Sequence, residues 1–357
     1  MAHLFIPGPT DVAPEILAAQ THRMIGHRSP ACIDLFARIQ PRLQRVFQTE
    51  QRVFITASSG SGLQEAALRN TVRDRALVCV GGAFAERWYE IAAANGLSAD
   101  RLDVPWGQPH DPERVADAVR RSAYDAVAIV HNESSTGVAN PVAEIAAVVR
   151  RISPDTLLLV DAVSSAGGVD LRPDAWGLDV LLTSSQKCLA LPPGLAFAAV
   201  SDRTLERAAA IPHRGWYFDF VLLDRYLKQH TTPATPAISL LYALDAQLER
   251  ILAEGLPARF ARHARMAERT QQWALDRFAL LAPEGFRSRT VTAVVNSRKI
   301  DVAALNVHLA AHDMAIAAGY GALRETTFRI GHMGEIQPDD LERLLSAIDD
   351  YLAAVGR

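Results

Sequence analysis

Residues 156–187, TLLLVDAVSSAGGVDLRPDAWGLDVLLTSSQK, decide the fold. They contain two short apolar runs, 156–161 and 179–183, and each run is followed at once by polar residues. Continuous apolar runs of this length are typical of strands that are covered on both faces. The carboxylate of Asp161 closes the first run, and the amine of Lys187 follows the second. Because a carboxylate is costly to bury alone, a positive group should face Asp161.

The same alternation extends to both sides of this stretch. From about residue 50 to 200, short apolar runs alternate with longer segments of helical spacing, which is the pattern of βαβ units. Further strands are expected at 75–80, 126–131 and 195–200, and helices at 61–72, 85–95, 112–122 and 141–151. The fold class predicted is α/β, with a mostly parallel, doubly wound central sheet in a large domain.

The length of 357 residues favours one large domain and a smaller one. The prolines of residues 230–236 mark a loop, and a long helical pattern follows it. Beyond that pattern, strand-like and helix-like segments alternate at 290–296, 301–312, 327–331 and 337–355. We expect an N-terminal segment over 1–20, a large domain over 21–245 and a small α+β domain over 246–357.

Composition argues against several classes of partner. The chain has 37 basic and 40 acidic residues, so it builds no basic field for nucleic acid or anionic lipid. It shows neither a basic leader followed by an apolar run nor an apolar window of about 18 residues, which favours a cytoplasmic protein without membrane contact. Three cysteines, Cys32, Cys79 and Cys188, show no paired spacing, so no disulfide framework or metal site is predicted.

Polar residues follow several of the expected strands, where ligands of open α/β sheets bind. Residues 58–62 (SSGSG) precede a helix, and small residues beside free helix amides favour a phosphate. Each feature alone has a plainer explanation: the Ser/Gly cluster as a loop, Asp161 as a turn cap, Lys187 as a surface lysine. Together with Phe84 they supply an amine, an anion, a phosphate cup and a stacking ring. Pyridoxal 5′-phosphate (PLP) needs these four groups, with Lys187 holding the cofactor as a Schiff base.

At this point the chain resembles the class V, fold-type I PLP-dependent aminotransferases, in particular the alanine/serine–glyoxylate (pyruvate) group. The resemblance extends over nearly the whole length. The motifs that carry it are 6–9 (IPGP), 24–29 (MIGHRS), 59–61 (SGS), 133–137 (ESSTG), 161–163 (DAV), 185–187 (SQK) and 328–331 (FRIG).

The resemblance implies a set of site residues. Cofactor-binding residues are Ser59, Gly60, Ser61, Phe84, Ser134, Asp161, Val163, Gln186, Lys187 and Thr231; catalytic residues are Lys187 and Asp161; substrate-binding residues are Arg329 and Gly8. Arg329 is implied to bind the α-carboxylate of the substrate. Two positions depart from the family: Phe84 replaces a tryptophan of some members, and Ser61 stands where others have His or Thr. Either Thr231 or Thr232 matches a threonine that reaches the neighbouring subunit's phosphate.

By resemblance, the protein is expected to move an amino group from a small amino acid to a 2-oxo acid such as glyoxylate or pyruvate, in a ping-pong reaction. Alanine and serine are the favoured donors, and aspartate and ureidoglycine stay open. A homodimer with active sites at the subunit interface is also implied. The alternatives are a 2-aminoethylphosphonate–pyruvate transaminase or another class V enzyme of the lyase or desulfurase type. A desulfurase needs a mobile cysteine, and no cysteine follows Cys188.

Overall fold

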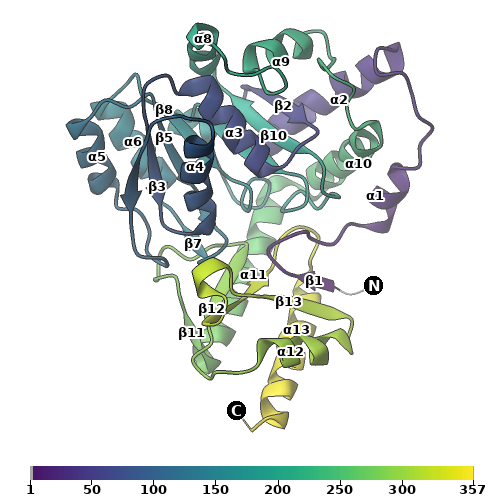
Figure 1. Ribbon diagram of the computed structural model, residues 1–357. Helices are drawn as coiled ribbons and strands as arrows, with labels where there is room; N and C mark the ends of the chain where they lie inside the picture. The colour runs from purple at the N-terminus through teal and green to yellow at the C-terminus, as the bar shows by residue number, and fades with distance from the viewer. Residues whose placement is uncertain (1–2, 357) are drawn as a thin grey trace.

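The computed structural model describes residues 3–356 and contains two bodies, each built around its own sheet (Figure 1). The larger body holds a seven-stranded sheet and the smaller one a five-stranded sheet. Within residues 3–356, no helix combines the length and the apolar character needed to span a bilayer.

The large sheet has the strand order β2-β10-β9-β8-β5-β3-β4. Its strands are β2 (Arg52–Thr56), β3 (Ala76–Val80), β4 (Ala99–Asp103), β5 (Ala126–Val130), β8 (Leu157–Asp161), β9 (Val180–Ser184) and β10 (Ala196–Val200). Neighbouring strands from β9 to β4 pair in parallel, and β10 is antiparallel to both of its neighbours. The expected mostly parallel sheet is therefore confirmed.

Helices cover both faces of this sheet, which explains the continuous apolar runs. Successive side chains of a strand point to opposite faces. Leu158 and Val160 of β8 pack into one core, and Leu157 and Leu159 pack into the other. The first core is completed by α2 (Pro30–Phe47), α5 (Pro112–Arg121), α6 (Val142–Ile152) and α10 (Ile238–Glu254); the second by α3 (Gly60–Thr71), α4 (Ala83–Ala94), α8 (Asp202–Ala210) and α9 (Phe220–Leu227).

The small sheet has the order β1-β13-β14-β12-β11. Its elements are β1 (His3–Phe5), β11 (Ala279–Leu280), β12 (Val291–Val295), β13 (Met314–Ala318) and β14 (Thr327–Gly331), with α11 (Leu256–Arg277), α12 (Val302–Ala310) and α13 (Pro338–Ala354). Shorter elements are α1 (Pro14–Ala19), β6 (Asn132–Glu133), β7 (Val138–Ala139), α7 (Pro173–Trp176) and a 3-10 turn, Gly321–Leu323. Strand β1 pairs in parallel with β13, so the N-terminal segment, of which residues 1–2 lie outside the described residues, is tied to the small sheet.

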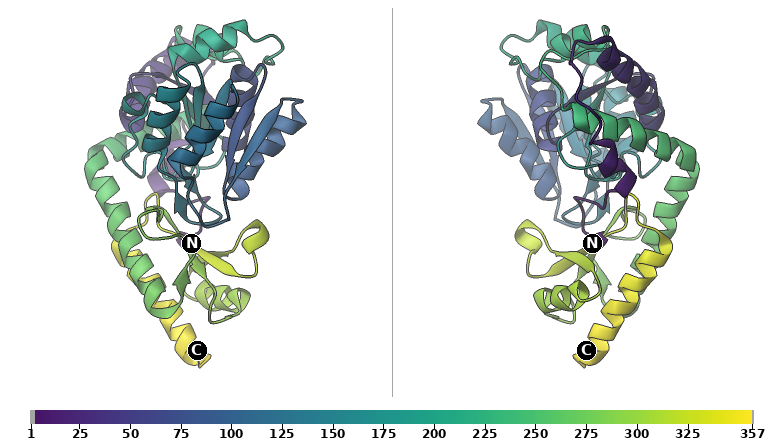
Figure 2. Two further views of the ribbon diagram at one scale, coloured as in Figure 1. Left: turned by 90° about the vertical axis from the view of Figure 1, so that its left-hand side faces the viewer. Right: turned by 90° about the vertical axis from the view of Figure 1, so that its right-hand side faces the viewer.

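The packing of α10 and α11 shows where one body passes into the other (Figure 2). Leu244 and Ile251 of α10 pack in a core of the large sheet, whereas Met266 and Trp273 of α11 pack in the small core. The expected division after residue 245 falls inside α10. We infer a boundary at Gly255, where a positive φ of 81° ends α10. The helical spacing of apolar residues continues on both sides of Gly255, so this spacing alone does not show where the large body ends.

A buried arginine in the first turn of α11 contacts both bodies. Arg259 is 0% exposed and donates to the carbonyl oxygens of Gly167, at 3.1 Å, and Cys188, at 2.6 Å. It also pairs with Glu254 at 2.7 Å and Glu335 at 3.1 Å. Burial raises the pKa of Glu335, but Arg259 and Arg250 hold it down at about 2. Arg259 thus links the loops after β8 and β9 to the small body.

We expect Arg259→Met to destabilise the protein by about 2–5 kcal/mol, because it leaves the buried carbonyls of Gly167 and Cys188 without this donor and removes one partner from each of the half-buried carboxylates of Glu254 and Glu335. Arg269→Met on the same helix is the matched control, since Arg269 pairs with Glu342 at 2.8 Å on an exposed surface. The control should cost about 1 kcal/mol or less. Denaturant unfolding of the three proteins measures both, and equal losses would contradict this account of Arg259.

Candidate active site

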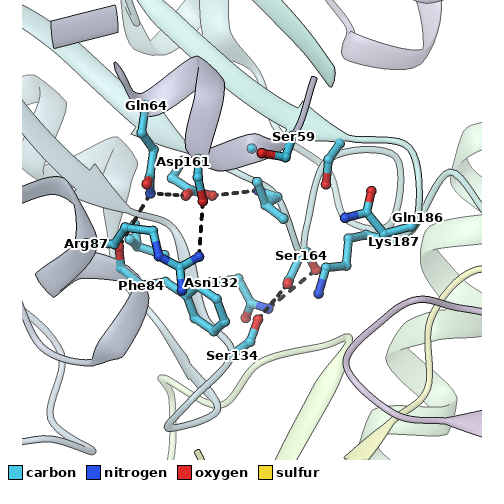
Figure 3. Close-up of a pocket in the computed structure, with 15 residues that line it drawn as sticks. Ser59, Gln64, Phe84, Arg87, Asn132, Ser134, Asp161, Ser164, Gln186 and Lys187 are labelled. Atoms are coloured by element: carbon cyan, nitrogen blue, oxygen red, sulfur yellow. Dashed lines mark hydrogen bonds between the residues drawn. The ribbon is translucent and has the colours of Figure 1, made fainter. Parts of the chain in front are cut away.

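A cavity of about 200 Å³ lies at the edge of the large sheet where β5, β8 and β9 end. Its wall contains the predicted residues Ser59, Gly60, Ser61, Phe84, Ser134, Asp161, Val163, Gln186 and Lys187. Figure 3 shows Lys187 and Gln186 on one side and Asp161 and Phe84 on the other. The cavity therefore brings together residues that are far apart in the sequence.

Lys187 is held by the N-terminal segment. Its Nζ donates to the carbonyl oxygen of Pro7. Thr10 fixes the same loop, because its amide donates to the Gln186 carbonyl at 3.0 Å and its hydroxyl to the Lys187 carbonyl at 3.0 Å. Gly8 lies so close that a Cβ there would be 2.6 Å from the Lys187 Cδ. Burial, followed by the charge of Arg329, lowers the pKa of the Lys187 amine to about 8.

Asp161 is the buried anion of the cavity and is 4% exposed. Its Oδ1 accepts from the Val163 amide at 2.8 Å, and its Oδ2 accepts from the Gln64 Nε2 at 2.7 Å. Burial raises the pKa of Asp161 to about 6, against the lowering effect of these two donors. Asp161 is therefore mostly ionised at neutral pH.

Helix α3 points its first turn into the cavity. Ser59 is its N-cap, and the Ser59 Oγ accepts from the Gly62 amide at 3.4 Å. A Cβ on Gly60 would lie 2.5 Å from a methyl carbon of Val163, so glycine permits this close approach. The Ser61 Oγ accepts from Arg87 at 3.1 Å. Free amides and a nearby guanidinium make this end of the cavity suited to a phosphate.

The backbone of Phe84, at the start of α4, is held by a buried glutamate. The Glu133 carboxylate accepts from the amides of Phe84, at 3.1 Å, and Ala85, at 3.0 Å, in the first turn of α4. It also accepts from the Ser135 hydroxyl at 2.6 Å. Burial raises the pKa of Glu133, and these donors oppose the shift. On its other side, the Phe84 ring stacks on Tyr320 with centroids 5.3 Å apart.

Arg329 stands behind the cavity wall rather than on it. It lies on β14, is 7% exposed and donates to the carbonyl oxygens of Ala318, at 3.1 Å, and Ser134, at 3.3 Å. Its guanidinium lies 5.3 Å from the centroid of the Tyr320 ring. Among residues 3–356, no carboxylate lies within ion-pair distance of Arg329. Burial lowers the pKa of its guanidinium to about 10. The arrangement leaves Arg329 able to pair with a carboxylate from outside the chain.

The two threonines that were predicted to bind phosphate lie elsewhere. The Thr231 hydroxyl donates to the Tyr226 carbonyl at 3.2 Å, and the Thr232 hydroxyl donates to the Ala234 carbonyl at 2.7 Å. Both line a separate depression, together with Ile55. Neither reaches the cavity of its own chain, so a contact with the partner subunit's phosphate stays a prediction.

The cavity wall also contains residues that sequence reasoning missed. They are Gln64, Arg87, Val130, Asn132, Ser164 and Ser184. Gln64 is one turn after Gly60, and Arg87 is one turn after Phe84. Helical spacing places each pair on one face, so these two residues could have been found.

The residues present fit PLP. Three buried wall atoms have no hydrogen-bond partner among residues 3–356: the Oε1 atoms of Gln64 and Gln186 and the Oγ of Ser184. Buried polar atoms of this kind are normally satisfied, so a polar ligand is expected. The cavity offers an amine, a carboxylate, a helix N-terminus and an aromatic face, which match the aldehyde, ring nitrogen, phosphate and ring of the cofactor.

The lowered pKa of Lys187 gives a testable pH dependence. An amine attacks an aldehyde only in its neutral form, and the neutral fraction rises with pH. The rate at which cofactor-free protein captures PLP covalently should therefore rise to a plateau above about pH 8. An ordinary lysine would keep rising to about pH 10.4. Stopped-flow absorbance measures the rate, and a midpoint near that of an ordinary lysine would contradict the burial argument.

Comparison with known proteins agrees with this geometry. The class V aminotransferase family matches residues 15–344. The small subunit of a soluble hydrogenase from Synechococcus is 37% identical, over 99% of this chain and 94% of that protein. The L-aspartate–glyoxylate aminotransferase of Paracoccus denitrificans is 34% identical, over 93% of this chain and 86% of that protein.

A solved structure shows the same fold and a similar sequence. The alanine–glyoxylate aminotransferase of Nostoc sp. superposes with a TM-score of 0.92 at 31% identity, over 98% of this chain and 95% of that chain. The family match covers most of the chain, and the lysine and aspartate expected from the sequence face one cavity. The chain therefore belongs to the class V aminotransferases and is a PLP-dependent transaminase.

Proposed function

We propose that the protein transfers the amino group of a small amino acid to a 2-oxo acid such as glyoxylate or pyruvate by a ping-pong mechanism. The observation that carries this proposal is the placement of three charges. Lys187 and Asp161 face one cavity, and Arg329 lies behind its wall, bonded to the Ser134 carbonyl and without a carboxylate partner among residues 3–356. Two of the relatives named above are aminotransferases of aspartate or alanine with glyoxylate, which supports donors of this size.

Lys187 has the central role in the proposed reaction. Bound PLP supplies an electron sink for the charge that develops on the donor's α-carbon. The Lys187 Nζ would hold the cofactor covalently, and as a free amine it would carry the donor's α-proton, first as general base and then as general acid. A pKa of about 8 leaves part of this amine neutral near pH 7, as a general base requires.

Asp161 acts on the cofactor, and Arg329 acts on the substrate. The ionised Asp161 carboxylate keeps the ring nitrogen protonated. Arg329 presents a planar guanidinium, which suits the two oxygens of an α-carboxylate. Pro7 and Gly8 cover Lys187 and limit the access of water to the amine.

A homodimer with active sites at the interface is part of this proposal. Thr231 and Thr232 line a depression apart from their own cavity, which fits a role in the partner subunit's phosphate site.

The alternative reactions find unequal support. Cys188 is buried, its thiol donates to the Ser164 carbonyl, and burial raises its pKa to about 12, so it does not suit the mobile thiolate of a desulfurase. Arg87 is different, because it lines the cavity as a second cation. A donor with a second acidic group, such as aspartate or aminoethylphosphonate, therefore stays in the test.

We expect alanine or serine to bleach the visible band of the cofactor-loaded protein and to yield the matching 2-oxo acid. Absorbance titration with alanine, serine, aspartate and aminoethylphosphonate measures this. Lys187→Ala should give no bleaching, whereas Lys228→Ala, on an exposed helix end, should behave as the wild type. Bleaching by aminoethylphosphonate alone would establish the phosphonate reaction instead, and an unchanged band with every donor would refute transamination of small amino acids.

A further inference from the structure

We propose that Gln64 is a positioning residue that keeps the Asp161 carboxylate ionised and oriented for the ring nitrogen of PLP. The inference rests on the cofactor site described above and adds a residue to it. Gln64 belongs to α3, the helix whose first turn forms the phosphate end of the cavity.

The hydrogen bond between Gln64 and Asp161 is short, and both side chains are buried. The Gln64 Nε2 lies 2.7 Å from the Asp161 Oδ2, and Gln64 is 2% exposed. Within residues 3–356, Gln64 is the one side chain that hydrogen-bonds to this carboxylate; the other donor is the Val163 amide. In a water-poor site, a hydrogen bond to a charged group contributes more than one between neutral groups.

The second contact of Gln64 decides which way its amide points. Nε2 also donates to the Phe84 carbonyl oxygen at 3.4 Å. Asp161 in its ionised form and the Phe84 carbonyl are both acceptors only, so the NH₂ group must face them. The Oε1 atom is left buried and without a partner among the described residues. If the amide turned to accept a proton from a neutral Asp161, the bond to Phe84 would be lost. The arrangement therefore favours the ionised carboxylate.

Several other groups act on the charge of Asp161. Glu133 raises its pKa and Lys187 lowers it. Arg87 lines the same cavity. His131 is buried, and burial lowers its pKa to about 4, so it is neutral near pH 7. Burial is the largest influence and favours the neutral acid, and Gln64 is a direct side-chain donor that opposes it.

Helix α3 consequently links two parts of the cofactor site. Gly60 stands at its first turn beside Val163, and Gln64 stands one turn later beside Asp161. A single rigid helix thus sets the distance between the phosphate end of the cavity and the carboxylate that receives the ring nitrogen.

The test is the pH dependence of PLP binding to the cofactor-free protein, measured as a dissociation constant by absorbance titration between about pH 5 and pH 9. Wild-type affinity should fall below about pH 6, as Asp161 takes up a proton. In Gln64→Met, loss of the donor should move this fall upward by about one pH unit. If the pKa of Asp161 rises by about one unit, its ionised fraction near pH 6 falls about fivefold, and above about pH 8 it hardly changes. The Gln64→Met protein should therefore bind PLP about fivefold more weakly than the wild type near pH 6 and nearly as tightly above about pH 8.

Two further variants make the result specific. Gln64→Glu keeps the shape but adds a like charge, so its fall should begin at a still higher pH. Gln51→Met is the matched control, because the Gln51 Nε2 donates to the Leu178 carbonyl at 3.0 Å and its Oε1, like that of Gln64, is buried without a partner among the described residues, where β2 and β9 begin and away from the cavity. It should follow the wild-type curve.

Three outcomes would overturn the inference: no change in Gln64→Met, a loss of equal size at every pH, or the same shift in Gln51→Met. Should Gln64→Met fail to fold, the Gln64→Glu profile decides alone, and a wild-type midpoint in it refutes the role. A wild-type protein that binds no PLP at any pH would instead refute the cofactor site itself, so the two failures are distinguishable.

Discussion

The structure depends on burying two opposite charges, Lys187 and Asp161, in one cavity at the edge of a parallel sheet. Burial disfavours both charged forms, so it moves their pKa values toward each other, to about 8 and about 6. An amine that is partly neutral and a carboxylate that is mostly ionised near pH 7 are the two states that the chemistry needs. The parallel strands supply this arrangement because β8 and β9 end side by side.

The small body contributes residues to the surroundings of the cavity. Strand β14 brings Arg329 to the wall beside Ser134, and β1 leads into the segment that covers Lys187. Arg259 joins these parts, since it contacts the carbonyl of Cys188, next to Lys187, and the carboxylate of Glu335. Under the role proposed for Arg329, the contact between the two bodies would set the position of the substrate carboxylate relative to the Lys187 amine.

Sequence reasoning located β3, β5, β8, β9 and β10 and the residues that follow them, because continuous apolar runs and the charges after them are local signals, but it did not predict β2. It missed β4, which reads ADRLD because an edge strand is half exposed, and it missed β1 as a strand because its partner β13 is distant in the sequence. The expected domain division after residue 245 stays a prediction. Helical spacing from Gly60 could have placed Gln64 at the cavity, but its contact with Asp161 is created only by the fold. The role of Thr231 or Thr232 depends on a second chain, so neither the sequence nor a single subunit reveals it.

The most direct test of the central claim uses the small number of lysines in the chain. There are three, Lys187, Lys228 and Lys299. Borohydride reduction of the cofactor-loaded protein makes the covalent link between lysine and PLP permanent, and peptide mass analysis then locates it. The account predicts the added mass on the peptide that contains Lys187 and on no other. Attachment to Lys228 or Lys299, or to no lysine at all, would contradict it.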